Sequence, residues 1–134
     1  MTERGAAALG LLGALAVVAV QLIIGATWSL GHDDPTELEL TRRCLEREKG
    51  LQVDATVDDT VAASARGGTL RTVVEGNPVT VNVASSQVEV ERLRAGYAAF
   101  GVVEPRVDVH GRYVSRWVDE PSPTQRQATY DCAY

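Results

Sequence analysis

The hydrophobic pattern divides the chain near residue 31. Residues 6–30 form one uncharged apolar run, interrupted only by Gln21, Thr27 and Ser29. A helix of that length reaches ~37 Å, which exceeds the ~30 Å hydrocarbon core of a bilayer. The pattern therefore predicts a transmembrane helix, with residues 1–31 as a cytoplasmic tip and membrane anchor and residues 32–134 as a separate domain.

Charges at the two ends of this run predict its orientation. Arg4 precedes the run, Trp28 lies near its exit, and no further Lys or Arg follows before Arg42. The positive-inside rule and the interfacial preference of tryptophan place Arg4 at the cytoplasmic interface, Trp28 at the outer one and the C-terminal domain outside the cell membrane. A signal peptide cleaved after Gly31 is the alternative, although its apolar segment would have only about 7–15 residues.

Helical periodicity and capping residues predict three helices in the domain. The first has Asp34 as its N-cap, Pro35 at its first position and Gly50 as its stop. The other two follow the capping boxes Ser86–Glu89 and Ser122–Gln125. One apolar stripe of the second helix comprises Val90, Leu93, Tyr97 and Phe100.

Alternation of apolar and polar residues predicts five strands. Residues 51–57 suit a half-buried strand, and a short helical turn follows over residues 61–65. Residues 70–74 and 79–83 suit a hairpin in which Val74 pairs with Val79 across a loop of residues 75–78. Residues 107–109 and 113–117 suit a second hairpin with a three-residue loop, because that register keeps Arg116 off the face that carries Val107 and Val109.

The element order is thus α-β-(short α)-ββα-ββα. This order predicts an α+β fold: a small antiparallel sheet covered on one face by helices, next to an N-terminal transmembrane helix. A domain of 103 residues can bury a modest core.

Two cysteines, Cys44 and Cys132, lie near opposite ends of the domain. In an oxidising compartment they are expected to form a disulfide, which would make the first and last helices neighbours. Two free thiols or a metal pair are the alternatives, but His32 and His110 lack the spacing of zinc ligands. We expect no cofactor.

Charge limits the classes of partner. The domain carries 12 basic and 17 acidic residues, which argues against nucleic-acid binding. Arginine outnumbers lysine twelve to one, which suggests a GC-rich, bacterial gene. The expected partners are the lipid bilayer, through residues 6–30, and a membrane or envelope protein.

Candidate catalytic residues are few. His110 lies in a predicted turn between Asp108 and Ser115, and we expect Asp108 and His110 on opposite faces of the strand, where they could not act together. Lys49 suits a helix end, and residues 32–34 suit a polar exit from the membrane rather than a cation site. Arg42, Arg43 and Arg47 alternate with glutamates as on a solvated helix face. Gly67-Gly68 lacks the remainder of a phosphate loop, and Tyr113 and Trp117 suit the core.

These observations predict a membrane-anchored extracytoplasmic binding or accessory module and not an enzyme. Two other functions stay open. One is a structural spacer that binds an envelope polymer or lipid headgroups, and the other is an unrecognised hydrolase around His110.

Overall fold

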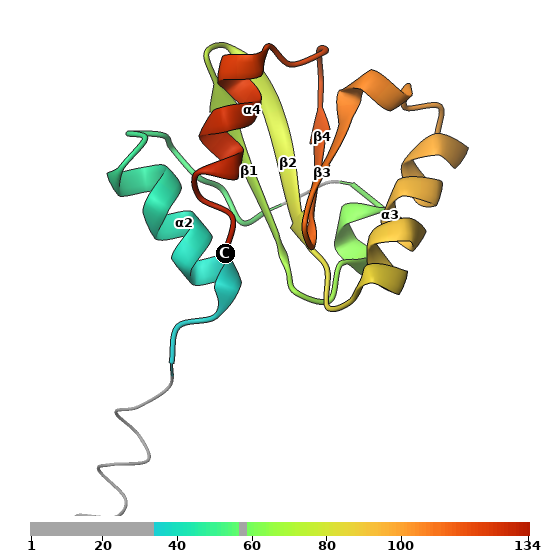
Figure 1. The fold of residues 1–134 in the computed structure, drawn as a ribbon, viewed down its shortest axis with the longest axis horizontal. Coiled ribbons are helices and arrows are strands. Elements are labelled where there is room, and N and C mark those ends of the chain that lie inside the picture. Colours follow the sequence, from blue (N-terminus) through green and yellow to red (C-terminus); the bar gives the residue numbers. More distant parts are fainter. Residues whose placement is uncertain (1–33, 57–58) are drawn as a thin grey trace, which may run out of the picture. The chain divides into compact units, whose positions relative to one another are not determined.

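The computed structural model describes residues 34–56 and 59–134. The predicted anchor, with Arg4 and Trp28, lies outside these residues. The described chain forms three α-helices and a four-stranded antiparallel sheet (Figure 1). No helix within the described ranges is long and apolar enough to span a bilayer. The elements are α2 (Glu37–Arg47), the 3-10 turn η1 (Ala62–Ser64), β1 (Thr69–Val74), β2 (Asn77–Val83), α3 (Gln87–Ala99), the 3-10 turn η2 (Glu104–Arg106), β3 (Val107–His110), β4 (Tyr113–Trp117) and α4 (Pro123–Tyr130).

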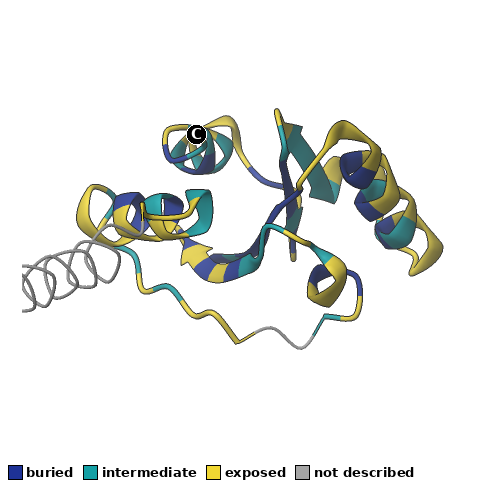
Figure 2. Ribbon diagram, turned by 90° about the horizontal axis from the view of Figure 1, so that it is seen from below, coloured by how far each residue is buried: buried dark blue, intermediate teal, exposed yellow. Residues whose placement is uncertain are grey.

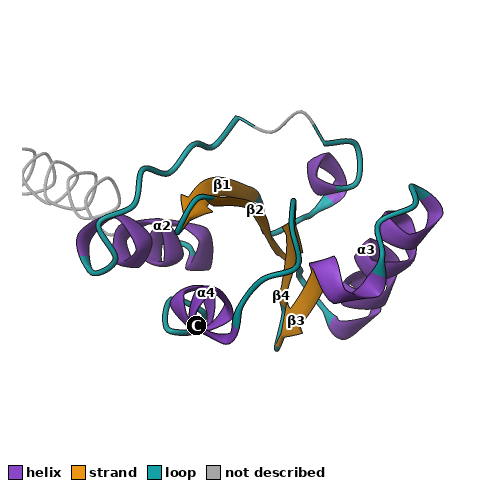
Figure 3. Cartoon of the chain, turned by 90° about the horizontal axis from the view of Figure 1, so that it is seen from above, coloured by secondary structure: helices purple, strands orange, loops and turns teal. Residues whose placement is uncertain are grey.

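The sheet has helices on both faces. Its strand order is β1-β2-β4-β3, with α2 and α4 on one face and α3 on the other (Figure 3). The α+β class and the antiparallel sheet are confirmed, but the expected single covered face is wrong. The reason lies in β2, where Thr80 and Asn82 are buried on the face opposite the valines. Polar residues at alternate positions did not mark a solvated face here.

The face under α2 and α4 holds the larger apolar core. Val79, Val81 and Val83 pack there with Trp117, which has no exposed surface. A second cluster joins Leu45 and Leu70 to the two cysteines. This core therefore ties the first and last helices to the centre of the sheet.

The face under α3 has a smaller core organised by Asn82. Val90, Leu93 and Tyr97 form the buried side of α3, whereas the other side of the helix is exposed (Figure 2). The Asn82 amide donates to the Tyr97 hydroxyl at 2.7 Å and to the Val114 carbonyl at 3.0 Å, and its oxygen accepts from the Thr69 hydroxyl at 3.0 Å. A fully paired amide can be buried without a large desolvation cost.

The first hairpin has a tighter turn than the sequence suggested. Val74 pairs with Asn77, not with Val79, so Glu75 and Gly76 alone form the turn. Both have positive φ, 48° and 78°, as a type I′ turn requires. Pro78 is accommodated inside β2 because its pair with Val73 belongs to the non-hydrogen-bonded class that alternates with Val74–Asn77. The register differs by two residues, so the predicted set of core-facing side chains is unchanged.

The second hairpin also closes with a two-residue turn. His110 pairs with Tyr113 and Val107 pairs with Arg116, so the predicted three-residue loop is wrong. Val107 and Val109 consequently face α3 together with Val114 and Arg116, while Tyr113 and Trp117 face the other helices. This arrangement is stable because both sheet faces are covered.

Residues 51–56 do not form the expected strand. One isolated bridge joins Asp54 to Arg71 at the edge of β1, and the Gln52 carbonyl accepts from the Thr72 hydroxyl at 2.8 Å. Leu51 is instead partly buried and packs against the core on the α2 and α4 side of the sheet. Leu51 and Val53 pack individually against this core, whereas Ala55 is exposed.

The predicted N-terminal caps are confirmed in full only for α4. Thr36, and not Asp34, is the N-cap of α2, since its hydroxyl accepts from Glu39 N at 3.3 Å. Ser122 and Gln125 form the complete capping box of α4. Ser86 caps α3, but the carboxylate of Glu89 turns away from it. That carboxylate accepts from Ser85 and from the backbone N–H of Arg66 at 2.6 Å.

Candidate binding site

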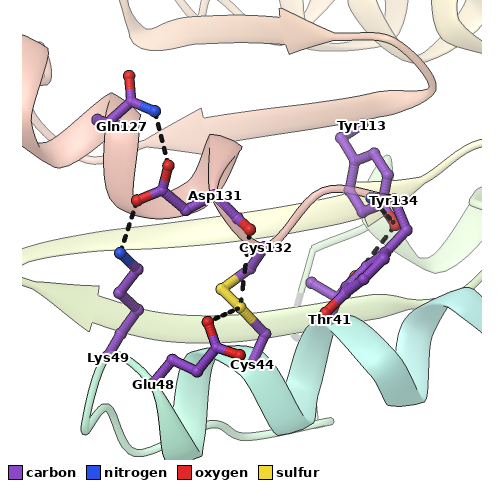
Figure 4. Close-up of a disulfide and its surroundings, with 9 residues drawn as sticks. All are labelled: Thr41, Cys44, Glu48, Lys49, Tyr113, Gln127, Asp131, Cys132 and Tyr134. Atoms are coloured by element: carbon purple, nitrogen blue, oxygen red, sulfur yellow. Dashed lines mark hydrogen bonds and ion pairs between the residues drawn. A yellow bond between two sulfur atoms is a disulfide. The ribbon is translucent and has the colours of Figure 1, made fainter.

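The two predicted disulfide residues are brought together. Cys44 of α2 and Cys132, just after α4, are bonded with their Cα atoms 5.5 Å apart, and both are buried. Figure 4 shows the bond beside the ion pair of Lys49 with Asp131, whose nitrogen and oxygen are 2.6 Å apart. Lys49 therefore links the end of α2 to the end of α4, a structural use beyond the predicted helix-end contact.

The residues around His110 share one face, contrary to expectation. Side chains two positions apart on a strand point the same way, and both Asp108 and His110 contact Tyr130. The Tyr130 hydroxyl donates to Asp108 at 2.6 Å, and the His110 ring stacks on the Tyr130 ring at 4.4 Å. Burial, followed by this hydrogen bond to Asp108, raises the pKa of Tyr130 to about 12.

This group lacks the geometry of a nucleophile with its base. Ser115 faces Asp108 across the strand pair, but the described residues show no hydrogen bond between His110 and either of them. Across residues 34–56 and 59–134, no three His, Cys, Asp or Glu side chains are grouped so as to hold a metal ion. The contacts that the described residues do show join α4 to β3 through Tyr130.

The other candidate residues from the sequence take part in contacts within the fold. Arg42 and Arg43 pair along α2 with Glu46 and Glu39. Gly67 and Gly68 lie against Val83 and Leu38, where an added Cβ would collide. His32 and Asp33 lie outside the described residues, as do the two predicted interface residues.

A pocket that the sequence did not suggest lies on the α3 side of the sheet. It measures about 300 Å³, and its wall combines the segment before η1, the C-terminal end of α3, the loop after it and β4. The lining residues are Asp59, Thr60, Val61, Tyr97, Phe100, Val102 and Arg116. Pockets of this size are at the lower end for small-molecule sites.

Arg116 gives the pocket a positive charge, and Asp59 lies in the same wall without forming an ion pair with it. Its Nε is buried and has no acceptor among the described residues. The ion pairs formed within residues 34–56 and 59–134 do not include it. A half-buried guanidinium without an ion pair is suited to binding an anion in the pocket.

Asp59 and Tyr97 supply the other polar groups. One carboxylate oxygen of Asp59 accepts from the backbone N–H of Val61 at 2.9 Å and of Ala62 at 3.2 Å, which fixes it at the rim. Burial raises the pKa of Tyr97 well above its ordinary value, and the nearby negative charge of Asp59 raises it further. The phenol is therefore a neutral hydrogen-bonding group at neutral pH.

Phe100 forms the apolar side of the opening. The sequence placed it on the buried stripe of α3, but its side chain is 70% exposed. The helix ends at Ala99, and Gly101 follows with a φ of 79°. Phe100 is thus outside the periodicity that buries Leu93 and Tyr97. An exposed aromatic at a pocket rim is a typical contact for a ligand.

A larger groove of about 750 Å³ lies beside β1. Its wall includes Asp54 and Arg71, whose backbones bond each other at 2.8 Å, and Thr72, which bonds Gln52. These polar groups already have protein partners. The pocket at Arg116 is the stronger candidate because its guanidinium is half-buried, whereas Arg71 in the groove is exposed.

Comparison with protein-family models, with characterised proteins and with solved structures finds no match to this chain. The pocket must therefore be interpreted from its own chemistry.

Proposed function

We propose that this chain is a membrane-anchored, extracytoplasmic binding module whose ligand or partner engages the pocket at Arg116. The half-buried guanidinium of Arg116, which forms no ion pair within the described residues, is the observation that carries the proposal. Asp59, Tyr97 and Phe100 surround it with groups suited to recognition, and they include no paired nucleophile and base.

The disulfide supports the extracytoplasmic part of the proposal. Disulfides persist in oxidising compartments and are rare in the cytosol. The bond between Cys44 and Cys132 closes most of the described domain, so its oxidation state matters to the whole fold. Together with the apolar run of residues 6–30, it favours a domain held outside by a retained helix.

Location is tested with a membrane-impermeant amine reagent on intact cells that express the full chain. Lys49 is the sole lysine, so only it and the N-terminal amine can react. We expect modification at Lys49 alone, and none in the Lys49→Arg variant, which keeps a cation beside Asp131. Modification at the N-terminus alone would reverse the orientation, and a mature chain starting at His32 would show that the anchor is removed.

Binding is tested by placing a photo-crosslinking amino acid at the pocket. Position 100 lies at the rim, and position 88, 81% exposed on the first turn of α3, is the matched control. We expect adducts in membranes from position 100 and not from position 88. Equal or absent adducts at the two positions would contradict a binding role for the pocket, whereas adducts with an envelope polymer would favour the spacer function.

A further inference from the structure

We infer that the pocket at Arg116 takes a small zwitterion with an apolar side chain, the chemistry of a hydrophobic α-amino acid. This inference rests on the proposed binding function and names its ligand class. Its carboxylate would bind Arg116, its ammonium group would bind Asp59, and its side chain would lie against Phe100 and Val102.

The argument for a carboxylate comes from the guanidinium. Arg116 lines the pocket, and the ion pairs formed within the described residues do not include its guanidinium. A planar guanidinium matches a carboxylate with two parallel hydrogen bonds. An anion of this kind would give the Arg116 guanidinium the ion pair that the described residues do not supply.

The argument for an ammonium group comes from the opposite charge in the same pocket. Asp59 is held in place by two backbone N–H groups on one of its oxygens. A ligand with only a carboxylate would meet repulsion from Asp59, and a ligand with only an ammonium group would meet repulsion from Arg116. A zwitterion satisfies both charges.

The argument for a small apolar side chain comes from size and lining. A pocket of about 300 Å³ lies at the lower end of the range for ligand sites, so its ligand must be small. Apart from the charged residues and Tyr97, its wall consists of Thr60 and three apolar residues, Val61, Phe100 and Val102, which offer contact surface and no further charge. A branched aliphatic or aromatic side chain fits that description.

The single phenylalanine of the chain permits a direct measurement. Incorporation of 4-fluorophenylalanine labels Phe100 alone, so the full chain in detergent micelles gives one fluorine resonance from the pocket rim. The probes are L-leucine, 4-methylpentanoate, which lacks the amine, and 3-methylbutylamine, which lacks the carboxylate. We expect a saturable shift with L-leucine and at least about tenfold weaker binding of the other two probes.

Substitution of the two charged residues tests whether each one binds the ligand. Arg116→Gln and Asp59→Asn should each weaken L-leucine binding about tenfold or more, and the asparagine can still accept from the backbone at position 61. The controls are Arg42→Gln and Glu91→Gln, which change exposed charges outside the pocket. An unchanged thermal midpoint in each variant shows that it remains folded.

Three results would overturn the inference. They are no saturable shift with L-leucine, equal binding of L-leucine and 4-methylpentanoate, and equal losses in the control variants. Each would remove the ligand class but leave the proposed function standing if Lys49 labelling and position-100 crosslinking succeed. Failure of both of those experiments, by contrast, would remove the proposed function itself.

Discussion

The hydroxyl oxygens of Thr41 and Tyr113 lie 3.0 Å apart in the buried layer between α2 and β4. The Tyr113 oxygen also accepts from the backbone N–H of Tyr134 at 3.2 Å. One phenol therefore joins the first helix, the sheet and the C-terminal residue, next to the disulfide (Figure 4).

Removing this phenol should destabilise the fold. We expect Tyr113→Phe to lower the free energy of unfolding by about 1–3 kcal/mol, since the buried Thr41 hydroxyl and the partly buried N–H of Tyr134 lose their partner. Urea denaturation measures the loss. Thr41→Val completes a double-mutant cycle, and additive losses would show that the two hydroxyls do not interact.

Loss of the disulfide should have a larger effect. We expect Cys44→Ser with Cys132→Ser to lower stability by about 4.6 kcal/mol, the chain-entropy value for a loop of this length. Non-reducing electrophoresis after thiol labelling should detect no free thiol in the native protein. Labelling of both cysteines would contradict the bond.

The core position of Trp117 gives a third prediction. Its side chain has no exposed surface, so Trp117→Ala should cost about 3–5 kcal/mol. Val88→Ala, at an exposed site, should change stability by less than about 0.5 kcal/mol. A loss under about 1 kcal/mol for the tryptophan variant would place that side chain outside the tightly packed core.

Glu89 predicts a pH dependence of stability. Burial raises the pKa of this carboxyl, but hydrogen bonds from Arg66 and Ser85 and the charge of Arg92 together hold it below its ordinary value. Because the folded-state pKa is the lower one, its stabilisation is complete above the unfolded-state value, about 4.3, and is lost as the pH falls through the folded-state pKa.

We therefore expect Glu89→Gln to cost about 2 kcal/mol at neutral pH and progressively less in acid. Urea denaturation over a pH series checks this. Glu91→Gln is the matched control on the same helix, because Glu91 is largely exposed and paired with Arg94. Parallel stability profiles for Glu89→Gln and the unmodified chain would contradict the role of the charge.

Tyr130 predicts an alkaline transition. Its pKa of about 12 means that the folded protein keeps this phenol protonated beyond the ordinary value near 10. Its stabilising contribution is present below about pH 10 and is lost as the pH rises through the folded-state value. The tyrosinate absorbance of the chain minus that of Tyr130→Phe isolates this group. Asp108→Asn should shift its transition to lower pH, and an unchanged transition would contradict the hydrogen bond.

Local signals in the sequence predicted much of this fold. The disulfide, the core tryptophan, the capping box at Ser122 and the antiparallel hairpins are confirmed. Each depends on residues that act within one turn or strand, or on cysteine chemistry that has few alternatives. The anchor and the orientation stay predictions, because residues 1–33 lie outside the described structure.

The missed features depend on tertiary contacts. The alternation in β2 could not show that Thr80 and Asn82 are covered, because α3 supplies that cover from a distant segment. The same second layer makes room for Arg116 on an inward face and so creates the pocket. The one sequence signal near this site was Gly101, which follows Phe100. Because the helix ends before Gly101, it does not bury Phe100.

The bond between α2 and α4 also affects how the domain would respond to proteases. A single peptide-bond cut between residues 45 and 131 would leave both fragments joined through Cys44 and Cys132. If the chain is anchored as proposed, such a nick would shed nothing from the cell surface. Release would require a second cut or a reductant.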